Sequence, residues 1–349
     1  MKLYGPRRLA MCLAFLMVAV LAIAGSPKGN YRLLKKVDFS AAPGGREYFD
    51  YITVDPSARR VYLSHGTEVK VVDADSGNAV GTVSDLKNDH GIALIKELGK
   101  GFISDGGGNR VVIFEMQTLN VTGEVKAGGN PDCIIYDPAS KHIFTFNGNT
   151  KDSTAIDPAN GTVVGTVPMG GRPESAVADG KGMIYDNIED TNEVVALDSR
   201  ALTIKARWPI APAATPTAMA MDQEHRRLFI GGRNKILAIM NADNGMVVQT
   251  FPIGDGVDAN IYDNSTRLLY VSTREGIVHI FHEDSPDKFR EVETVKTEFG
   301  AKTMALDPKT HNLYLTTANF GPPPAPTAEE PRPNPVPIPG TFRLLIYGH

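Results

Sequence analysis

One pattern fills most of this 349-residue chain: a short apolar stretch, a turn and a second apolar stretch recur at nearly constant intervals. The copies lie 40, 42, 42, 43, 41 and 44 residues apart, and their first residues are Asp50, His90, Asp132, Glu174, Thr217, Asp258 and Lys302. A fixed period of this length is typical of repeat architectures, in which each unit buries its apolar faces by packing against its neighbours.

Each copy has the composition of a small antiparallel sheet. In the first copy the apolar runs are "YITVD" (51–55), "VYLS" (61–64), "VKVVD" (69–73) and "AVGTV" (79–83), and Asp, Asn, Gly and Pro occupy the turns between them. β-Branched and aromatic residues favour strands, and these turn residues favour hairpins. Four strands in about 40 residues make one propeller blade. The sequence therefore predicts an all-β fold, a seven-bladed β-propeller with four-stranded antiparallel blades.

The two ends of the chain predict how the ring closes. The seventh copy supplies two strands and, after an interruption, a third at "FRLLIY" (342–347), so that it lacks an outer strand. A spare apolar segment, "YRLLKKVDF" (31–39), precedes the first complete copy. Pairing 31–39 with 342–347 would complete the last blade and remove exposed sheet edges. Residues 25–349 are therefore expected to form one domain.

The N-terminus has the layout of a secretory signal peptide. Basic residues precede the apolar run "LAMCLAFLMVAVLAIA", which ends in the small-residue motif Ala22-Ile23-Ala24. A membrane anchor is the alternative, but the run is shorter than the roughly 20 residues that span a bilayer. We expect residues 1–24 to be removed near Ala24, which leaves no membrane span and places the mature chain in the periplasm or outside the cell.

The charge of the mature chain limits the classes of partner that it can bind, and its cysteine content limits its covalent bonds. Loss of three basic residues leaves 33 Lys and Arg against 40 Asp and Glu, a formal charge of −7. This balance makes nucleic acid an improbable partner, because clustered basic residues supply most of the affinity for phosphates. Only Cys133 remains, within the apolar run "CIIY", so we expect a buried thiol and no intrachain disulfide. We also expect a monomeric protein.

The second strands of the copies carry a family resemblance. They read "YLSH", "FISD", "FTFN", "YVST" and "YLTT", and in the first copy "VKVVD" and an Asp-Ser-Gly turn follow. Over residues 31–349 the chain resembles the YVTN-repeat β-propellers, the YncE-like group of bacterial exported proteins. The WD40 signature is absent, and the single tryptophan, Trp208, also speaks against quinone-cofactor dehydrogenases. The resemblance implies a seven-bladed fold and export, but no particular chemistry.

The candidate site is a column of polar residues at the mouth of the central channel. In a propeller the first strands line the channel, and the second strands end on the face where the first begin. The predicted ligand-binding residues on this face are Asp50, His65, His90, Asp105, Asp132, Asn147, Glu174, Asp258 and Lys302. Carboxylates beside imidazole can bind Ca²⁺ or Zn²⁺ or transfer protons. The predicted metal ligands are Asp50, His90, Asp132 and Glu174; the alternative is that these residues are solvated turn-formers.

A proline-rich segment interrupts the seventh copy on the same face. Residues 321–340 contain nine prolines, from Pro322 to Pro339. Proline at this density favours an extended chain without sheet hydrogen bonds. The segment is expected to be a loop inserted in blade 7, either a tolerated surface insertion or a docking segment or lid at the channel mouth.

Two functions fit these features. The first is a non-catalytic scaffold that binds a protein or small ligand on the face carrying the channel mouth. The second is a divalent-cation-dependent enzyme of the lactonase or lyase type at the same mouth. An enzyme requires side chains that converge to coordination or hydrogen-bonding distance, whereas a binding face requires only an accessible surface.

Overall fold

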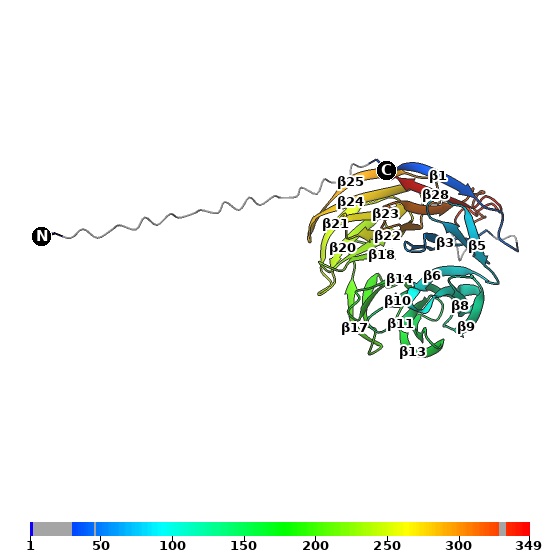
Figure 1. Ribbon diagram of the computed structural model, residues 1–349, viewed down its shortest axis with the longest axis horizontal. Coiled ribbons are helices and arrows are strands. Elements are labelled where there is room, and N and C mark those ends of the chain that lie inside the picture. Colours follow the sequence, from blue (N-terminus) through cyan, green and yellow to red (C-terminus); the bar gives the residue numbers. More distant parts are fainter. Residues whose placement is uncertain (3–29, 45–46, 328–332) are drawn as a thin grey trace.

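The computed structural model describes residues 1–2, 30–44, 47–327 and 333–349, and within them seven four-stranded antiparallel sheets form a ring (Figure 1). The first strand of each sheet lies at the centre and the last at the rim (Figure 1). The prediction of a seven-bladed propeller is confirmed. Apart from its first two residues, the expected signal peptide lies outside the described residues.

The first three blades follow one another in sequence. Blade 1 comprises β2 (Ile52–Asp55), β3 (Arg60–Ser64), β4 (Val69–Asp73) and β5 (Ala79–Val83). Blade 2 comprises β6 (Asp89–Ile95), β7 (Lys100–Asp105), β8 (Arg110–Glu115) and β9 (Val121–Lys126), with short 3₁₀ turns η1 (Lys96–Leu98) and η2 (Gly106–Gly108). Blade 3 comprises β10 (Pro131–Asp137), β11 (His142–Asn147), β12 (Asp152–Asp157) and β13 (Thr162–Pro168).

The next three blades repeat this order. Blade 4 comprises β14 (Pro173–Ala178), β15 (Met183–Ile188), β16 (Glu193–Asp198) and β17 (Thr203–Pro209). Blade 5 comprises β18 (Pro216–Asp222), β19 (Arg227–Gly232), β20 (Ile236–Asn241) and β21 (Val247–Pro252). Blade 6 comprises β22 (Val257–Asp263), β23 (Leu268–Thr273), β24 (Ile277–Ser285) and β25 (Lys288–Lys296).

Blade 7 joins the two ends of the chain. Its strands are β26 (Met304–Leu306), β27 (Leu313–Thr317), β28 (Arg343–Gly348) and, at the rim, the N-terminal β1 (Arg32–Asp38). β1 pairs antiparallel with β28 from Arg32 opposite Gly348 to Asp38 opposite Arg343. The predicted closure is confirmed, and it leaves no edge of β28 unpaired.

The core lies between the blades. Seven hydrophobic clusters of described residues each fill one interface between neighbouring blades, including the interface of blade 7 with blade 1. At that interface Tyr314 of blade 7 is fully buried and donates a hydrogen bond of 2.9 Å to the carbonyl oxygen of Ala74 in blade 1. Burial of apolar surface between sheets therefore holds the ring together.

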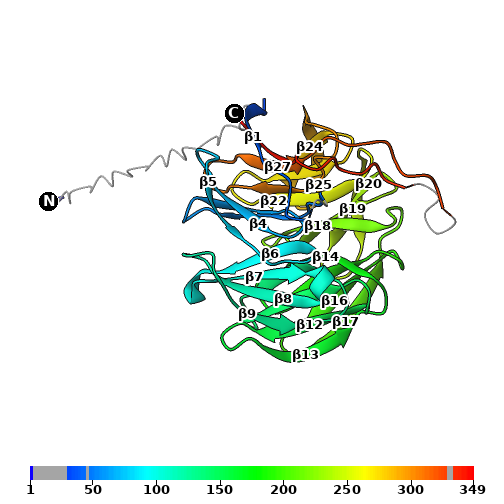
Figure 2. The ribbon, with the colours of Figure 1, turned by 90° about the vertical axis from the view of Figure 1, so that its right-hand side faces the viewer.

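The two faces of the disc differ. The first strands begin on the face from which the proline-rich segment leaves, and this segment projects from that side of the disc (Figure 2). We call this the mouth face and the opposite one the rear face. Within the described part of the chain, no helix has the length and apolar character needed to cross a membrane.

Candidate binding site at the channel mouth

The central channel itself is narrow and mostly apolar. Its cavity of about 190 Å³ is lined by residues from all seven blades, among them Tyr51, Ile92, Cys133, Ala176, Met219, Ala259 and Met304. The Cys133 thiol is buried, as predicted, and burial raises its pKa well above the ordinary value. Most of the polar side chains that could bind a ligand therefore lie at the mouth of the channel.

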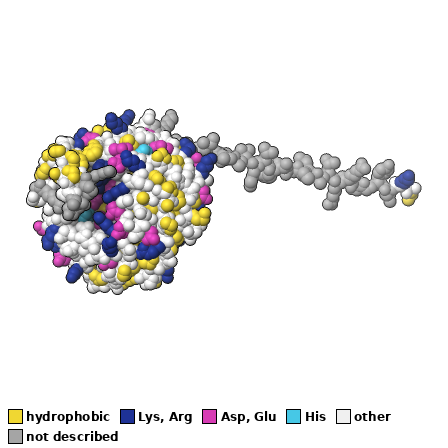
Figure 3. Space-filling view, turned by 180° about the vertical axis from the view of Figure 1, so that it is seen from behind, with side chains coloured by type: hydrophobic (Ala, Val, Ile, Leu, Met, Phe, Trp, Pro, Cys, Tyr) yellow, Lys and Arg dark blue, Asp and Glu magenta, His cyan; other side chains and the backbone are white. Residues whose placement is uncertain are grey.

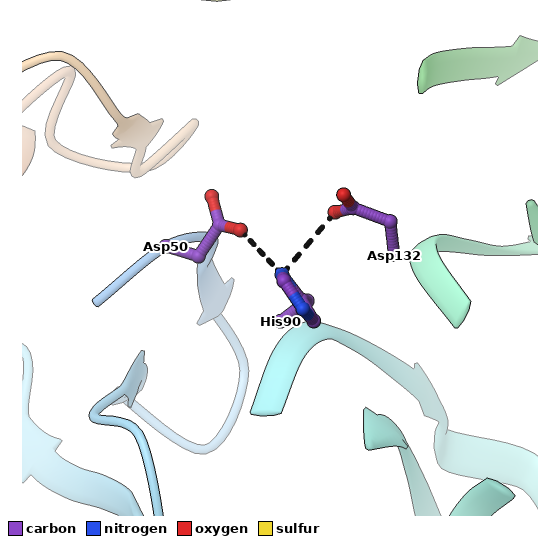
Figure 4. A group of neighbouring side chains, drawn as sticks. All are labelled: Asp50, His90 and Asp132. Atoms are coloured by element: carbon purple, nitrogen blue, oxygen red, sulfur yellow. Dashed lines mark hydrogen bonds and ion pairs between the residues drawn. The ribbon is translucent and has the colours of Figure 1, made fainter. Parts of the chain in front are cut away.

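Three residues of the predicted column meet around one imidazole (Figure 4). The Nδ1 atom of His90 lies 2.7 Å from Oδ2 of Asp50 and 3.4 Å from Oδ1 of Asp132. Each residue lies at or just before the start of the first strand of a different blade, so the ring geometry brings together positions that are 40 residues apart or more. Potential ligand atoms of the three residues lie within 4.8 Å of one another.

Hydrogen bonds already satisfy this imidazole on both sides. The Tyr48 hydroxyl lies 2.9 Å from Nδ1 of His90 and 2.9 Å from Oδ2 of Asp50. The side-chain amide of Asn88 lies 2.8 Å from Nε2 of His90. His90 is 5% exposed, so the ring is held in a fixed orientation beneath the mouth.

Charge determines the protonation of this group. Burial opposes a charged imidazole, but the carboxylates of Asp132 and Asp50 raise the pKa of His90 to about 9. Burial raises the pKa of Asp132 to about 6, against the opposing charge of His90. Burial acts in the same direction on Asp50, yet the hydrogen bond and charge of His90 hold its pKa below the usual value. His90 therefore serves as a cation between carboxylates at neutral pH.

The other column residues lie around the channel mouth but are not part of the group of Asp50, His90 and Asp132. Lys302 forms an ion pair with Asp258, and its charge also reaches Asp50. Glu174 lies outside the group around His90, although burial and the charge of Asp132 raise its pKa well above the ordinary value. Thr217 instead donates a hydrogen bond of 2.7 Å to the carbonyl oxygen of Val257 in the next blade.

The second-strand residues of the prediction are not part of this group. Asp105 pairs across the sheet with Asp89, the neighbour of His90, and Asn147 pairs with Pro131, the neighbour of Asp132. Side chains alternate between the two sides of a sheet, so this offset of one residue turns Asp105 and Asn147 away from the column.

Their partners show what these side chains do instead. Asp105 accepts hydrogen bonds from the backbone of Lys87 and Asn88 and pairs with Arg110 at 2.7 Å. Asn147 donates to Asp152 at 2.7 Å. Both are fully buried and support loops between strands.

His65 has a third kind of environment. It is fully buried, stacks on the ring of Phe342 at 4.1 Å between centroids, and contacts Glu47 through Nε2 and Glu68 through Nδ1. This packing fastens blade 1 to β28 of blade 7. The sequence predicts His65 as a ligand-binding residue of the mouth face, but its imidazole turns into the blade interface instead.

A groove opens beside the column on the mouth face. We define the mouth groove, a cavity of about 770 Å³, by its aromatic residues, prolines and charged residues: Tyr48, Phe49, Phe299, Phe320, Pro324, Pro333, Pro335, Pro337, Pro339, Glu47, Arg274 and Lys302. Lys302 belongs to both the column and the groove, so the two are continuous. In the view from behind, basic and acidic side chains gather beside a yellow apolar area on this face (Figure 3).

The described parts of the proline-rich segment form one wall of the groove. Residues 321–327 and 333–340 are extended and mostly exposed, as predicted, but they are also tied to the fold. Phe320 pairs with Pro337 in an isolated bridge, and Gly321 donates to the carbonyl oxygen of Val336 at 2.9 Å. The backbone of Gly340 donates to Glu47 at 2.8 Å. The ends of the segment are therefore fixed at the mouth.

Several residues of the site were not predicted from the sequence. Tyr48 and Asn88, which hold His90, lie in loops just before their strands, and Phe299 and Phe320 are far apart in the chain although their rings lie 5.2 Å from each other. Tyr48 and Asn88 each lie two residues before a column residue, and this position is the sequence signal that could have identified them. No comparable signal marks the two phenylalanines.

Comparison with known proteins shows the fold alone. No protein-family model matches the chain, and no curated protein matches its sequence. A chain in "Kuenenia stuttgartiensis Hydrazine Synthase" has a TM-score of 0.68 and 15% identity, over 80% of this chain and 94% of that one. A chain in "Crystal Structure of Mitotic Checkpoint Complex" has a TM-score of 0.70 and 16% identity, over 99% of each chain. "Crystal structure of RRP9 WD40 repeats" reaches 0.71 at 8% identity, over 91% and 97%.

Proposed function

We propose that this protein is an exported, non-catalytic scaffold of the YVTN-repeat type that binds a protein partner in the mouth groove. The observation that carries the proposal is the groove itself, an open cavity of about 770 Å³ walled by aromatic rings and prolines. Phe299 is 47% exposed, and Val336 of the proline-rich segment is 51% exposed. Exposed apolar side chains gathered in one groove are typical of an interaction site.

The charges at the mouth favour a partner that presents a basic side chain. Among the described residues, four carboxyl groups, those of Asp50, Asp132, Glu174 and Asp258, gather where His90 and Lys302 form the ion pairs, and Arg233 and Arg274 act on the mouth through their charge. Burial and mutual repulsion raise the pKa of Asp132 and Glu174, so an added positive charge would lower the cost of ionising them. Among the structural neighbours, the mitotic checkpoint chain is described as part of a protein complex, which agrees with this role.

The second candidate is a divalent-cation-dependent enzyme of the lactonase or lyase type. The convergence of Asp50, His90 and Asp132 within 4.8 Å favours it. Against it, both ring nitrogens of His90 already have hydrogen-bond partners. Elemental analysis of the purified protein separates the two: stoichiometric Ca²⁺ or Zn²⁺ lost on Asp132→Asn substitution would support the enzyme.

The scaffold is tested by replacing residues 321–338 with a short Gly-Ser linker. We expect the melting temperature to change little, because most of the described residues of the segment are exposed, whereas binding in the groove is lost. A basic peptide with flanking leucines, titrated by calorimetry, is the probe, and a peptide with Glu in place of Lys is its control. Equal affinity for both peptides, or binding that survives the replacement, would contradict the proposal.

Export is tested separately. N-terminal sequencing of the protein recovered from the periplasm or the medium is expected to begin at Gly25. A protein that keeps its first 24 residues in the cell would overturn this part of the proposal without affecting the groove.

A further inference from the structure

The rear face carries an unusual carboxylate in the interface between blades 5 and 6. Glu283, near the end of β24, is 1% exposed, and Asp222, at the end of β18, is also 1% exposed (strands in Figure 1). Both carboxylates approach the same atom, Nδ1 of His225, at 2.9 Å and 2.7 Å respectively. Potential ligand atoms of all three lie within 4.8 Å of one another.

The internal repeats show that Glu283 departs from the pattern of the fold. Its backbone N–H donates to the carbonyl oxygen of Arg267 across the turn. In other blades the residue that makes the same bond has a small or apolar side chain: Ala74, Met116, Ser199 and Ala242. At the corresponding place between blades 3 and 4, the Ser199 hydroxyl donates to Asp137 at 2.5 Å. Glu283 instead brings a second carboxylate to the buried aspartate.

His225 departs from the pattern as well. It is the third residue after Asp222 and donates its backbone N–H to that carboxylate. Four other copies also have an aspartate at the end of the first strand, followed by the same kind of turn. In these copies the third residue after the aspartate is small: Ala58, Ser140, Thr266 and Thr310. Two departures from the repeat, 58 residues apart in the sequence, thus meet at a single buried aspartate.

The polar groups at this place are incompletely satisfied. Nδ1 of His225 forms its hydrogen bond with Asp222, and Oε1 of Glu283 is buried without a hydrogen bond although it lies 2.9 Å from the same nitrogen. The other oxygen of Glu283 is held by the Tyr262 hydroxyl, which aims Oε1 at the cluster. Two buried carboxylates that face each other require a cation between them to offset desolvation and repulsion.

We propose that Asp222, His225 and Glu283 bind a divalent transition-metal ion, with Zn²⁺ as the best match, that joins blades 5 and 6. Imidazole nitrogen and carboxylate oxygen are both ligands of zinc, whereas Ca²⁺ takes oxygen ligands only. The ligand atoms need to move apart by a few tenths of an ångström to surround the ion. The His225 side chain is 24% exposed, which gives the ion access from solvent and leaves a position for water.

The group around His90 at the mouth differs from the rear cluster in the hydrogen bonds of its potential ligand atoms. There, both nitrogens of His90 and the Asp50 oxygen have hydrogen-bond partners, among them Tyr48 and Asn88. On the rear face the acceptor Oε1 of Glu283 has no hydrogen bond. The rear cluster is therefore the stronger candidate for a metal, and it is independent of the function proposed for the mouth.

The test uses the mature protein after treatment with a chelator, titrated with Co²⁺ as a spectroscopic substitute for zinc. We expect one equivalent to bind with visible absorption of a four- or five-coordinate site, and Zn²⁺ to displace it and raise the melting temperature. Glu283→Ala and His225→Thr, which restore residues found in other blades, should weaken binding by at least about 100-fold. His282→Thr, which removes a histidine of the same strand that is 22% exposed and pairs with Asp284, should leave binding unchanged.

Two results would overturn the inference. Absence of Co²⁺ and Zn²⁺ binding by the wild-type protein would mean that the three side chains form a hydrogen-bonded cluster without a metal. Binding that persists in both Glu283→Ala and His225→Thr would place the metal elsewhere. Because both substitutions introduce residues that the repeat already uses at these positions, we expect them to fold, and circular dichroism checks this.

Discussion

At the scale of single residues, the charge of the mouth depends on His90. The imidazole supplies the positive charge between Asp50 and Asp132, and two neutral partners, Tyr48 and Asn88, fix its orientation. A buried cation among carboxylates stabilises the fold only while it keeps its proton. Stability should therefore depend on pH in a way that reveals this residue.

The pKa of His90 rises from about 6.5 in the unfolded chain to about 9 in the folded one. Because the folded state binds this proton more tightly, the contribution is complete below pH 6.5 and is lost as the pH rises through 9. This difference corresponds to roughly 3 kcal/mol. We expect urea unfolding of wild type and His90→Gln to differ most near pH 6.5 and to converge above pH 9.

Asp89 contributes in the same direction. Burial raises its pKa to about 8, against the opposing charge of His90, so it too favours the folded state at low pH. The comparison therefore measures the charge of His90 together with its effect on this neighbouring carboxyl group. A free-energy difference between wild type and His90→Gln that stayed constant from pH 6.5 to 9.5 would show that His90 does not titrate in this range.

At the scale of elements, aspartates at the ends of the first strands connect neighbouring blades. Each accepts hydrogen bonds from its own turn, and most also contact a basic or hydroxyl side chain of the next blade. These pairs are Asp55–Lys96, Asp137–Ser199, Asp179–Arg226, Asp263–His311 and Asp307–Arg59. One residue thus shapes the hairpin turn and ties that blade to its neighbour.

The pair Asp307–Arg59 joins the last blade to the first and gives the clearest test. Asp307 is fully buried, and Arg59 approaches it at 2.6 Å. Arg59→Ala would leave an uncompensated buried carboxylate, so we expect a loss of roughly 3 kcal/mol in the free energy of unfolding. Arg290→Ala, which breaks the exposed pair with Asp284, is the control and should cost less than about 1 kcal/mol. Similar losses in both variants would contradict a special role for the buried pair.

At the scale of the whole molecule, the ring depends on β1. This strand covers β28 along its full length, and Tyr31 just before it bonds to the Tyr270 hydroxyl at 2.9 Å and to the carbonyl oxygen of His311 at 2.8 Å. The N-terminal segment therefore contacts blade 6 as well as blade 7.

Deletion of residues 31–39 should open the ring at this point. We expect a lower melting temperature, a broader transition and a tendency to associate through the exposed edge of β28. Calorimetry and size-exclusion chromatography measure these effects, with a protein lacking only residues 1–30 as the control. A truncated protein that melts like this control and stays monomeric would show that closure through β1 is dispensable.

The sequence by itself determined the architecture. The seven copies at 40 to 44 residues fixed the number of blades, the missing outer strand predicted its replacement by 31–39, and the start of each copy placed Asp50, His90 and Asp132 at one mouth. These inferences succeed because they rest on local strand and turn chemistry and on a period, both of which are written along the chain.

Only the tertiary structure decided which side chains meet. The sidedness of Asp105 and Asn147 depends on a one-residue offset between paired strands, and the inward turn of His65 depends on packing against Phe342. The meeting of His225 with Glu283 depends on how two blades dock. Such contacts cross blade boundaries, and their geometry follows from the packing of whole sheets, which no local pattern in the sequence encodes.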